Sequence, residues 1–132
     1  MILSFKPQFK QPILDGTKIH TIREDPHDRW KRGRKIHQAT GVRTKNYDCF
    51  NETYCMGVQK IEIIWYPKQG PAVYLNDYTF PFYGQMQNET FGFEQMELLA
   101  KNDGFPSVEA FFEWFNKDFD GKIIHFTDYR YK

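Results

Sequence analysis

Cysteine and long apolar runs are scarce in this chain of 132 residues. Its two cysteines, Cys49 and Cys55, are too few for a disulfide scaffold and lack the spacing of a metal knuckle. No secretory signal begins the chain, and no run reaches the roughly 18 apolar residues of a membrane-spanning helix. These absences predict a cytoplasmic protein that keeps its thiols reduced and has no membrane partner.

Net charge is also nearly absent, because 18 Lys and Arg offset 17 Asp and Glu. The whole molecule therefore has no strong attraction to nucleic acid or membrane. The charge is nevertheless uneven: residues 16–45 contain nine Lys or Arg and three acidic residues, whereas residues 89–120 contain eight acidic residues and two lysines. The acidic half is typical of solvated helix surfaces, and the basic half is the better candidate for a ligand site.

Repeats and low-complexity linkers are missing as well, so residues 1–132 are interpreted as one domain. Aromatic residues, in contrast, make up 18% of the chain. Runs rich in β-branched and aromatic residues predict strands. These lie at residues 2–5, 17–23, 34–40, 53–65, 72–75 and 78–82, with a turn at Asn76-Asp77 between the last two, and from Gly121 to Tyr129.

Helical spacing appears in three places. Phe9, Ile13 and Leu14 predict a short helix that ends at Gly16, and residues 93–101 predict a second helix that stops at Gly104. Ser107 is placed as the cap of a third helix, whose phenylalanines at 111, 112, 115 and 119 form a core stripe. Helices and strands in this order predict an α+β fold.

Two segments carry a family resemblance. Residues Ile13-Leu14-x-Gly16-x-Lys18-x-x-Thr21-Ile22-Arg23, followed by Lys31-x-Gly33, resemble the opening motif of the ASCH domain family. Residues 100–109, AKNDGFPSVE, are similar to the second signature of that family. The resemblance implies a small PUA-like β-barrel with a short N-terminal helix and two helices before the last strand. It also implies a cleft at the Gly16–Arg23 motif that binds RNA or a nucleotide.

Within that family, residues 9–36 are most similar to the bacterial acetylcytidine amidohydrolases. The resemblance places their catalytic lysine, threonine and acidic residue at Lys18, Thr21 and Asp103, with aspartate here in place of glutamate. Amide hydrolysis needs an activated nucleophile and donors that face the developing oxyanion. Lys18 would serve as the base toward Thr21 or water, and Asp103 would orient the lysine; a plain ion pair between Lys18 and Asp103 is the alternative.

Strand geometry sets a condition on this hypothesis. On a regular strand Lys18, His20 and Ile22 point to one face, whereas Thr21 and Arg23 point to the other. Lys18 and Thr21 can meet only if the backbone is irregular near Lys18. We therefore predict an irregular backbone after Gly16.

The basic segment from His27 to His37 contains five Lys or Arg and one tryptophan. Lys31, Arg32 and Arg34 could contact phosphates while Trp30 stacks on a base. The alternative is a solvated turn with Trp30 in the core.

Residues 41–51, with Arg43 among them, form a loop that either selects the ligand or is a mobile surface segment. The four histidines show no metal-ligand spacing, and Cys49 has no evident partner. We therefore predict neither a metal nor a cofactor.

Three functions remain open. The first is a module that binds RNA, a nucleotide or a modified nucleoside in a cleft containing Arg23 and the Lys18, Thr21 and Asp103 set. The second is an amidohydrolase acting on an acylated nucleoside such as acetylcytidine. The third is a protein-interaction domain that uses exposed aromatics such as Tyr78, Phe80, Phe82 and Tyr83.

Overall fold

The computed structural model describes residues 1–75, 81–83 and 90–131. Its elements follow one another as β1 (Ile2–Phe5), a 3-10 turn (Pro7–Phe9), α1 (Lys10–Asp15), β2 (His20–Arg23), β3 (Lys35–Thr40), β4 (Asp48–Tyr54), β5 (Gly57–Tyr66), β6 (Gly70–Leu75), β7 (Pro81–Tyr83), α2 (Thr90–Asn102), α3 (Val108–Trp114) and β8 (Phe119–His125). The N-terminal strand and the three predicted helices are therefore confirmed.

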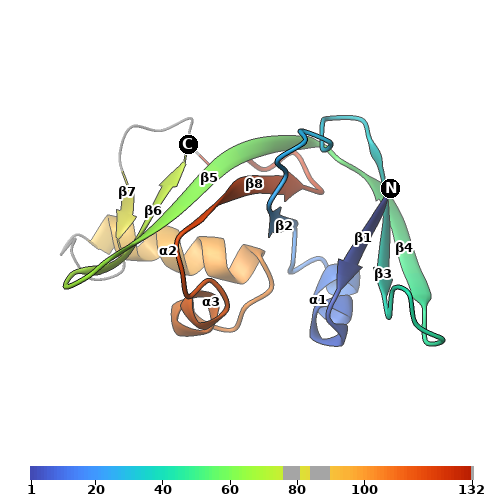
Figure 1. Ribbon diagram of the computed structural model, residues 1–132, viewed down its shortest axis with the longest axis horizontal. Coiled ribbons are helices and arrows are strands. Elements are labelled where there is room, and N and C mark those ends of the chain that lie inside the picture. The colour runs from blue at the N-terminus through green and yellow to red at the C-terminus, as the bar shows by residue number, and fades with distance from the viewer. Residues whose placement is uncertain (76–80, 84–89, 132) are drawn as a thin grey trace.

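The described strands form two sheets. The smaller has the order β1-β3-β4, with β1 parallel to β3, and the larger has the order β2-β8-β5-β6-β7, with antiparallel pairs throughout. Figure 1 shows the small sheet beside α1 and the long strand β5 arching over the two later helices. The α+β prediction is confirmed. The predicted barrel is not, because these two sheets do not close into one.

The chain changes sheets at Cys55 and Met56, which the sequence pattern did not reveal. Instead of one strand over residues 53–65, β4 ends at Tyr54 and β5 begins at Gly57. Cys55 still donates its N–H to the Arg34 carbonyl beside β3, whereas the Met56 N–H bonds to the His125 carbonyl of β8. The predicted loop 41–51 is also shorter than expected, because its last residues belong to β4.

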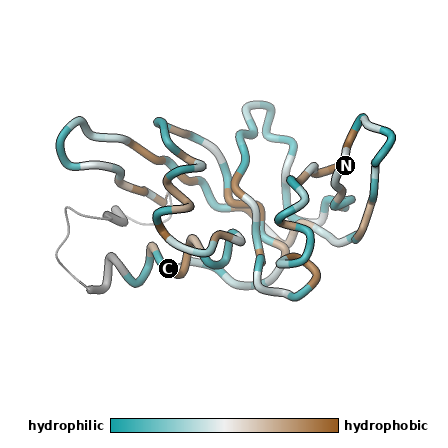
Figure 2. The backbone as a smooth tube through the Cα atoms, turned by 90° about the horizontal axis from the view of Figure 1, so that it is seen from below, coloured by the Kyte–Doolittle hydropathy of each residue, from teal (hydrophilic) through white to brown (hydrophobic). Residues whose placement is uncertain are grey.

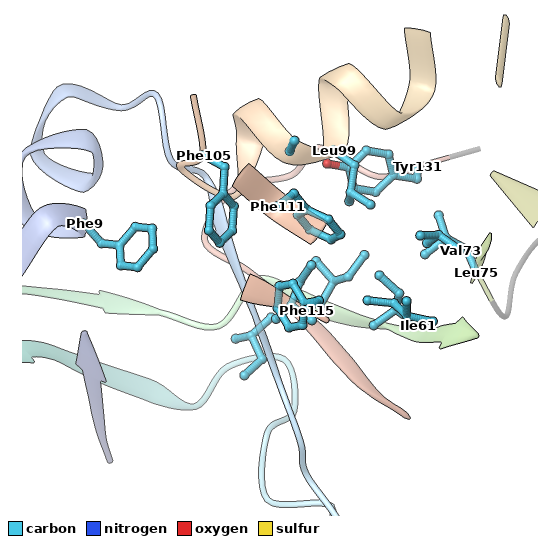
Figure 3. Close-up of a cluster of buried hydrophobic side chains, with 14 of the residues drawn as sticks. Phe9, Ile61, Val73, Leu75, Leu99, Phe105, Phe111, Phe115 and Tyr131 are labelled. Atoms are coloured by element: carbon cyan, nitrogen blue, oxygen red, sulfur yellow. The ribbon is translucent and has the colours of Figure 1, made fainter. Parts of the chain in front are cut away.

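One apolar core joins both sheets and the helices. Its members come from β1, β3, β5, β6, α2, α3 and β8, and include Ile36, Ile61, Leu75, Leu99, Phe111 and Ile123. Figure 3 shows Phe105 between Phe9 and Phe111, and Phe111 and Phe115 beside Ile61, Val73 and Leu75 of β5 and β6. In Figure 2 several outer turns are polar, while apolar segments follow the central strands and helices.

Local signals explain where the later elements begin and end. Ser107 caps α3 as predicted, since its hydroxyl accepts a hydrogen bond from the Ala110 N–H at 3.1 Å. The phenylalanine stripe is confirmed at Phe111, Phe112 and Phe115, but Phe119 belongs to β8, which begins two residues before the predicted start. The predicted turn at Asn76-Asp77 and the residues up to 80 lie outside the described residues.

Candidate active site

The backbone around Lys18 is irregular, as the site hypothesis required. Helix α1 ends at Asp15, and Gly16 follows with φ +81°, a left-handed conformation that glycine adopts without strain. The Lys18 N–H bonds back to the Pro12 carbonyl at 3.0 Å, and β2 begins only at His20. Lys18 therefore belongs to the turn after α1 and is not bound by the alternation of β2.

Lys18 meets Asp103 in the interior. Its Nζ lies 3.2 Å from Asp103 Oδ1 and 2.5 Å from the Asp103 carbonyl oxygen, although the two residues are 85 positions apart. Both side chains are at most 4% exposed. The ammonium also lies 4.8 Å from the centre of the Phe9 ring, within the range of a cation–π contact. The predicted pairing of Lys18 with Asp103 is confirmed as a contact.

His20 and Tyr131 extend this pair into a buried chain of polar groups. His20 Nδ1 lies 3.1 Å from Asp103 Oδ1, and His20 Nε2 lies 2.6 Å from the Tyr131 hydroxyl, which accepts a hydrogen bond from Asn102 Nδ2. Since Tyr131 accepts from Asn102, its own proton is available to His20 Nε2. We assign His20 as the neutral tautomer with the proton on Nδ1, donating to Asp103.

Burial shifts the pKa values of the polar groups Lys18, His20 and Tyr131. Desolvation lowers the pKa of Lys18 from its usual value, an effect that Asp103 opposes and Arg23 reinforces. Desolvation likewise lowers the pKa of His20, against the opposing effect of Asp103, which agrees with a neutral imidazole. Burial raises the pKa of the Tyr131 phenol. Asp103 is therefore an orienting acceptor that holds Lys18 and His20 together.

Thr21 and Arg23 share one face of β2, as the alternation predicted. Arg23 Nε donates to Thr21 Oγ1 at 3.1 Å, and an Arg23 guanidinium nitrogen donates to the Ser4 carbonyl of β1 at 2.5 Å. The guanidinium carbon lies 4.8 Å from the centre of the Phe5 ring. Because Thr21 Oγ1 accepts from Arg23, its hydroxyl proton remains for a second partner.

A cleft of about 1200 Å³ brings these side chains together. Lys18, Thr21, Arg23, Arg43 and Asp103 all line it. Its other lining residues come from β1, the 3-10 turn, β2, the segment 40–47 and residues 105–115, where Trp114 is 46% exposed. Tyr47 in the 40–47 segment also lines the cleft and is 46% exposed. Sequence reasoning missed Trp114 because it lies outside the buried phenylalanine stripe of α3, and a residue there is expected only to face solvent.

The basic segment predicted to bind phosphates lies elsewhere. Lys31, Arg32 and Arg34 are exposed but do not line the cleft. Trp30 is 5% exposed and belongs to the apolar core, so its predicted role in stacking on a base is wrong. Its burial follows from Asp25, whose carboxylate accepts the Trp30 N–H at 2.9 Å and folds the loop inward.

His20 and Tyr131 are two further site residues that sequence reasoning missed. From the sequence, His20 was considered as a metal ligand and as a member of one strand face, but not as a partner of Asp103. Tyr131 has no signal in the sequence, because its partner is 111 positions away.

Cys49 does have neighbours with ligand atoms, contrary to the expectation from sequence. The ligand atoms of His37, Cys49 and Glu52 lie within 4.8 Å of one another on β3 and β4.

Among the described residues, no helix is long and apolar enough to cross a membrane. Comparisons with known protein families, with curated proteins and with solved structures found no match to this chain. The functional argument therefore rests on the residues of the chain itself.

Proposed function

We propose that the cleft binds a nucleotide or a modified nucleoside, free or within an RNA strand, and that the chain is an ASCH domain of PUA-like type. One observation carries this proposal. The two segments that resemble the family's signatures lie far apart in sequence, yet Lys18, Thr21 and Arg23 of the first meet Asp103 of the second in one cleft. Two unrelated surface segments would have no reason to converge on a shared site.

The chemistry of the lining suits such a ligand. Four Lys or Arg side chains line the cleft against the carboxylate of Asp103, which favours an anionic phosphate; they are Lys6, Lys18, Arg23 and Arg43. The half-exposed rings of Trp114 and Tyr47 offer flat surfaces on which a base can stack. Trp114 therefore takes the stacking role first expected for Trp30.

Calorimetric titration with cytidine 5′-monophosphate tests the binding proposal. Lys18→Met is expected to raise Kd at least about tenfold, the equivalent of 1.4 kcal/mol, because it removes a buried cation from the cleft. Lys31→Met deletes the same charge outside the cleft and is the matched control, with an expected change below about twofold. Absence of binding by the unmodified protein, or equal losses in both variants, would refute the proposal for this ligand.

The stacking role has its own test. Trp114→Ala is expected to weaken binding by about 1–3 kcal/mol, the usual contribution of a base stacked on an aromatic ring. A ribose 5-phosphate probe, which has no base, should bind the unmodified protein and Trp114→Ala equally. Equal losses for both probes would mean that Trp114 supports the cleft and does not contact a base.

Hydrolysis of an acylated nucleoside is the second candidate, and the lowered pKa of Lys18 favours it. A lowered pKa makes Lys18 give up its proton more readily, and the neutral amine can take a proton from water or from the Thr21 hydroxyl. With water as the nucleophile, the hydroxide oxygen would add to the acetyl carbonyl carbon, the C–N bond would break, and the released exocyclic amine would take the proton back from Lys18, which gives acetate and cytidine directly. With Thr21 as the nucleophile, the same step would release cytidine and leave an acetyl ester on Thr21 Oγ1, and a water molecule deprotonated by Lys18 would then hydrolyse this ester to acetate. His20 and Tyr131 would hold Asp103 in position behind the lysine.

Release of cytidine from N4-acetylcytidine tests this chemistry. Lys18→Arg keeps a cation but removes the base, so it is expected to retain binding and to lose turnover by a factor of 100 or more. Turnover by the unmodified protein should rise with pH, because the neutral amine of Lys18 is the active form. Undiminished turnover in Lys18→Arg would exclude Lys18 as the base. Binding without turnover would leave the binding proposal intact and remove the hydrolase.

The protein-interaction alternative has no support from the described residues. Tyr78 and Phe80 lie outside them. Phe82 and Tyr83 belong to β7, whose side chains are not described.

A further inference from the structure

A second candidate site lies on the small sheet, outside the cleft described above. His37 on β3 pairs directly with Glu52 on β4, and Ala39 pairs with Cys49. The register shifts by one residue between Gln38 and Ala39, so β4 carries one extra residue there. Such a bulge redirects the side chains that follow it. It accounts for the approach of Cys49 to His37 and Glu52, whose ligand atoms all lie within 4.8 Å.

The exposure of Cys49 is unusual for its residue type. Free cysteine is among the most buried side chains in proteins, and Cys55 in this chain is fully buried. Cys49, in contrast, is exposed on β4 with an imidazole and a carboxylate beside it. Sulfur, nitrogen and oxygen donors together are the ligand set that zinc accepts in proteins.

We propose that His37, Cys49 and Glu52 bind one Zn²⁺ ion, with water as the fourth ligand. Tetrahedral zinc with bonds of about 2.0–2.3 Å separates its ligand atoms by roughly 3.5 Å. The present separation of up to 4.8 Å closes by rotation of the Cys49 and Glu52 side chains toward the half-buried His37, with no change in the register of the sheet. Binding places the ion on the Cys49 thiolate, and the thiol proton passes to solvent.

Glu52 has a competing partner that the ion must displace. Lys35 Nζ lies 2.9 Å from Glu52 Oε1, and both side chains are about half exposed. Exposed ion pairs of this kind contribute little, typically below about 1 kcal/mol. The exchange of Lys35 for a divalent cation is therefore favourable, and Lys35 tunes the affinity of the site.

Cobalt(II) substitution gives a spectroscopic test of the proposal. Co²⁺ bound to a thiolate produces a sulfur-to-metal charge-transfer band, and Zn²⁺ should abolish the band by displacing the cobalt. The expected result is one Co²⁺ per chain, with the band lost in Cys49→Ser and the Zn²⁺ affinity reduced at least about tenfold in His37→Ala and Glu52→Gln. His27→Ala removes an exposed histidine elsewhere and should leave the titration unchanged.

Two further results decide the outcome. Lys35→Met should tighten Zn²⁺ binding, because it frees Glu52 from its ion pair and removes a charge that repels the metal ion. If Glu52 were not a zinc ligand, the loss of this ion pair would not increase the affinity for Zn²⁺. Absence of the band in the unmodified protein, or a band that survives in Cys49→Ser, would overturn the proposal. Circular dichroism of each variant checks that the fold is intact.

Discussion

Gly104 is the residue that lets Lys18 reach Asp103. It has φ +91°, and a Cβ atom placed there would lie 2.9 Å from Lys18 Cδ and 3.1 Å from Phe9 Cδ1. The glycine therefore serves both the left-handed turn after α2 and the close approach of the lysine stem.

Gly104→Ala is expected to destabilise the fold and to weaken ligand binding, because the methyl group must displace the Lys18 side chain. Gly33→Ala is the matched control: Gly33 has a similar φ of +94° but nothing within 4 Å of its Cβ position. Both variants pay about 1–2 kcal/mol for the left-handed conformation. Urea unfolding and nucleotide titration measure the excess effect at Gly104, and equal behaviour of the two variants would contradict the packing argument.

His125, whose ring lies beside those of His20 and Tyr131, should make the stability of the fold depend on pH. It is fully buried, its Nε2 donates to Gln59 Oε1 at 2.9 Å, and its Nδ1 has no hydrogen-bond partner among the described residues. Desolvation lowers the pKa of His125 from 6.5 to about 3, with smaller contributions from His20 and Arg130. Between these pH values the unfolded chain binds a proton that the folded protein excludes.

The free energy of unfolding should therefore fall as the pH drops from about 6.5 toward 3. The slope for one such proton is about 1.4 kcal/mol per pH unit, and His20 adds to it with the same sign. His125→Gln keeps a donor to Gln59 and removes the titration, so urea unfolding between pH 7 and pH 4.5 should show a slope smaller by one proton. An unchanged slope would mean that His125 is protonated in the folded state.

Among the elements, the loop 24–34 is ordered by one buried carboxylate. Asp25 accepts the N–H groups of Arg29 and Trp30 at 2.8 and 2.9 Å and the ammonium of Lys122 at 3.0 Å. Its side chain is 3% exposed, whereas that of Asp28, which also contacts Lys122, is 67% exposed. The loop is thereby folded against β8, and Trp30 enters the core.

Asp25→Ala should cost about 3 kcal/mol or more, because it leaves the buried Lys122 ammonium and two N–H groups without this acceptor. Asp28→Ala should cost less than about 1 kcal/mol, since the Asp28 carboxylate is largely solvated and Lys122 keeps Asp25 as its partner. Urea unfolding gives both values. The emission of Trp30 should shift to longer wavelength only in Asp25→Ala, and a similar effect of both variants would disprove the assigned role of Asp25.

At the scale of the whole molecule, local patterns predicted the elements well but not how they meet. The short first helix, the cap at Ser107 and the irregular backbone at Lys18 followed from turn residues and strand alternation. The change of sheet at Cys55 and Met56 did not, because residues 53–65 read as one continuous β-rich run. The parallel pairing of β1 with β3 is also invisible locally, since it joins residues about 35 positions apart.

The candidate site shows the same division. Lys18, Thr21, Arg23 and Asp103 were predicted from the sequence to share a cleft, and all four line it; their roles stay a prediction. Trp30 was wrongly expected to stack on a base, because the composition of the segment does not show whether a tryptophan is exposed or buried in the core. His20 and Tyr131 were missed, because their roles depend on contacts made across more than 80 positions of the chain.

The central claim is that the cleft at the meeting of the two sheets is the ligand site. Backbone amide NMR during titration with cytidine 5′-monophosphate tests it most directly. We predict saturable shifts that concentrate at Lys18, Thr21, Arg23 and Arg43, together with the indole N–H of Trp114. Shifts confined to the basic residues 27–37, or no saturable shifts at all, would contradict the account.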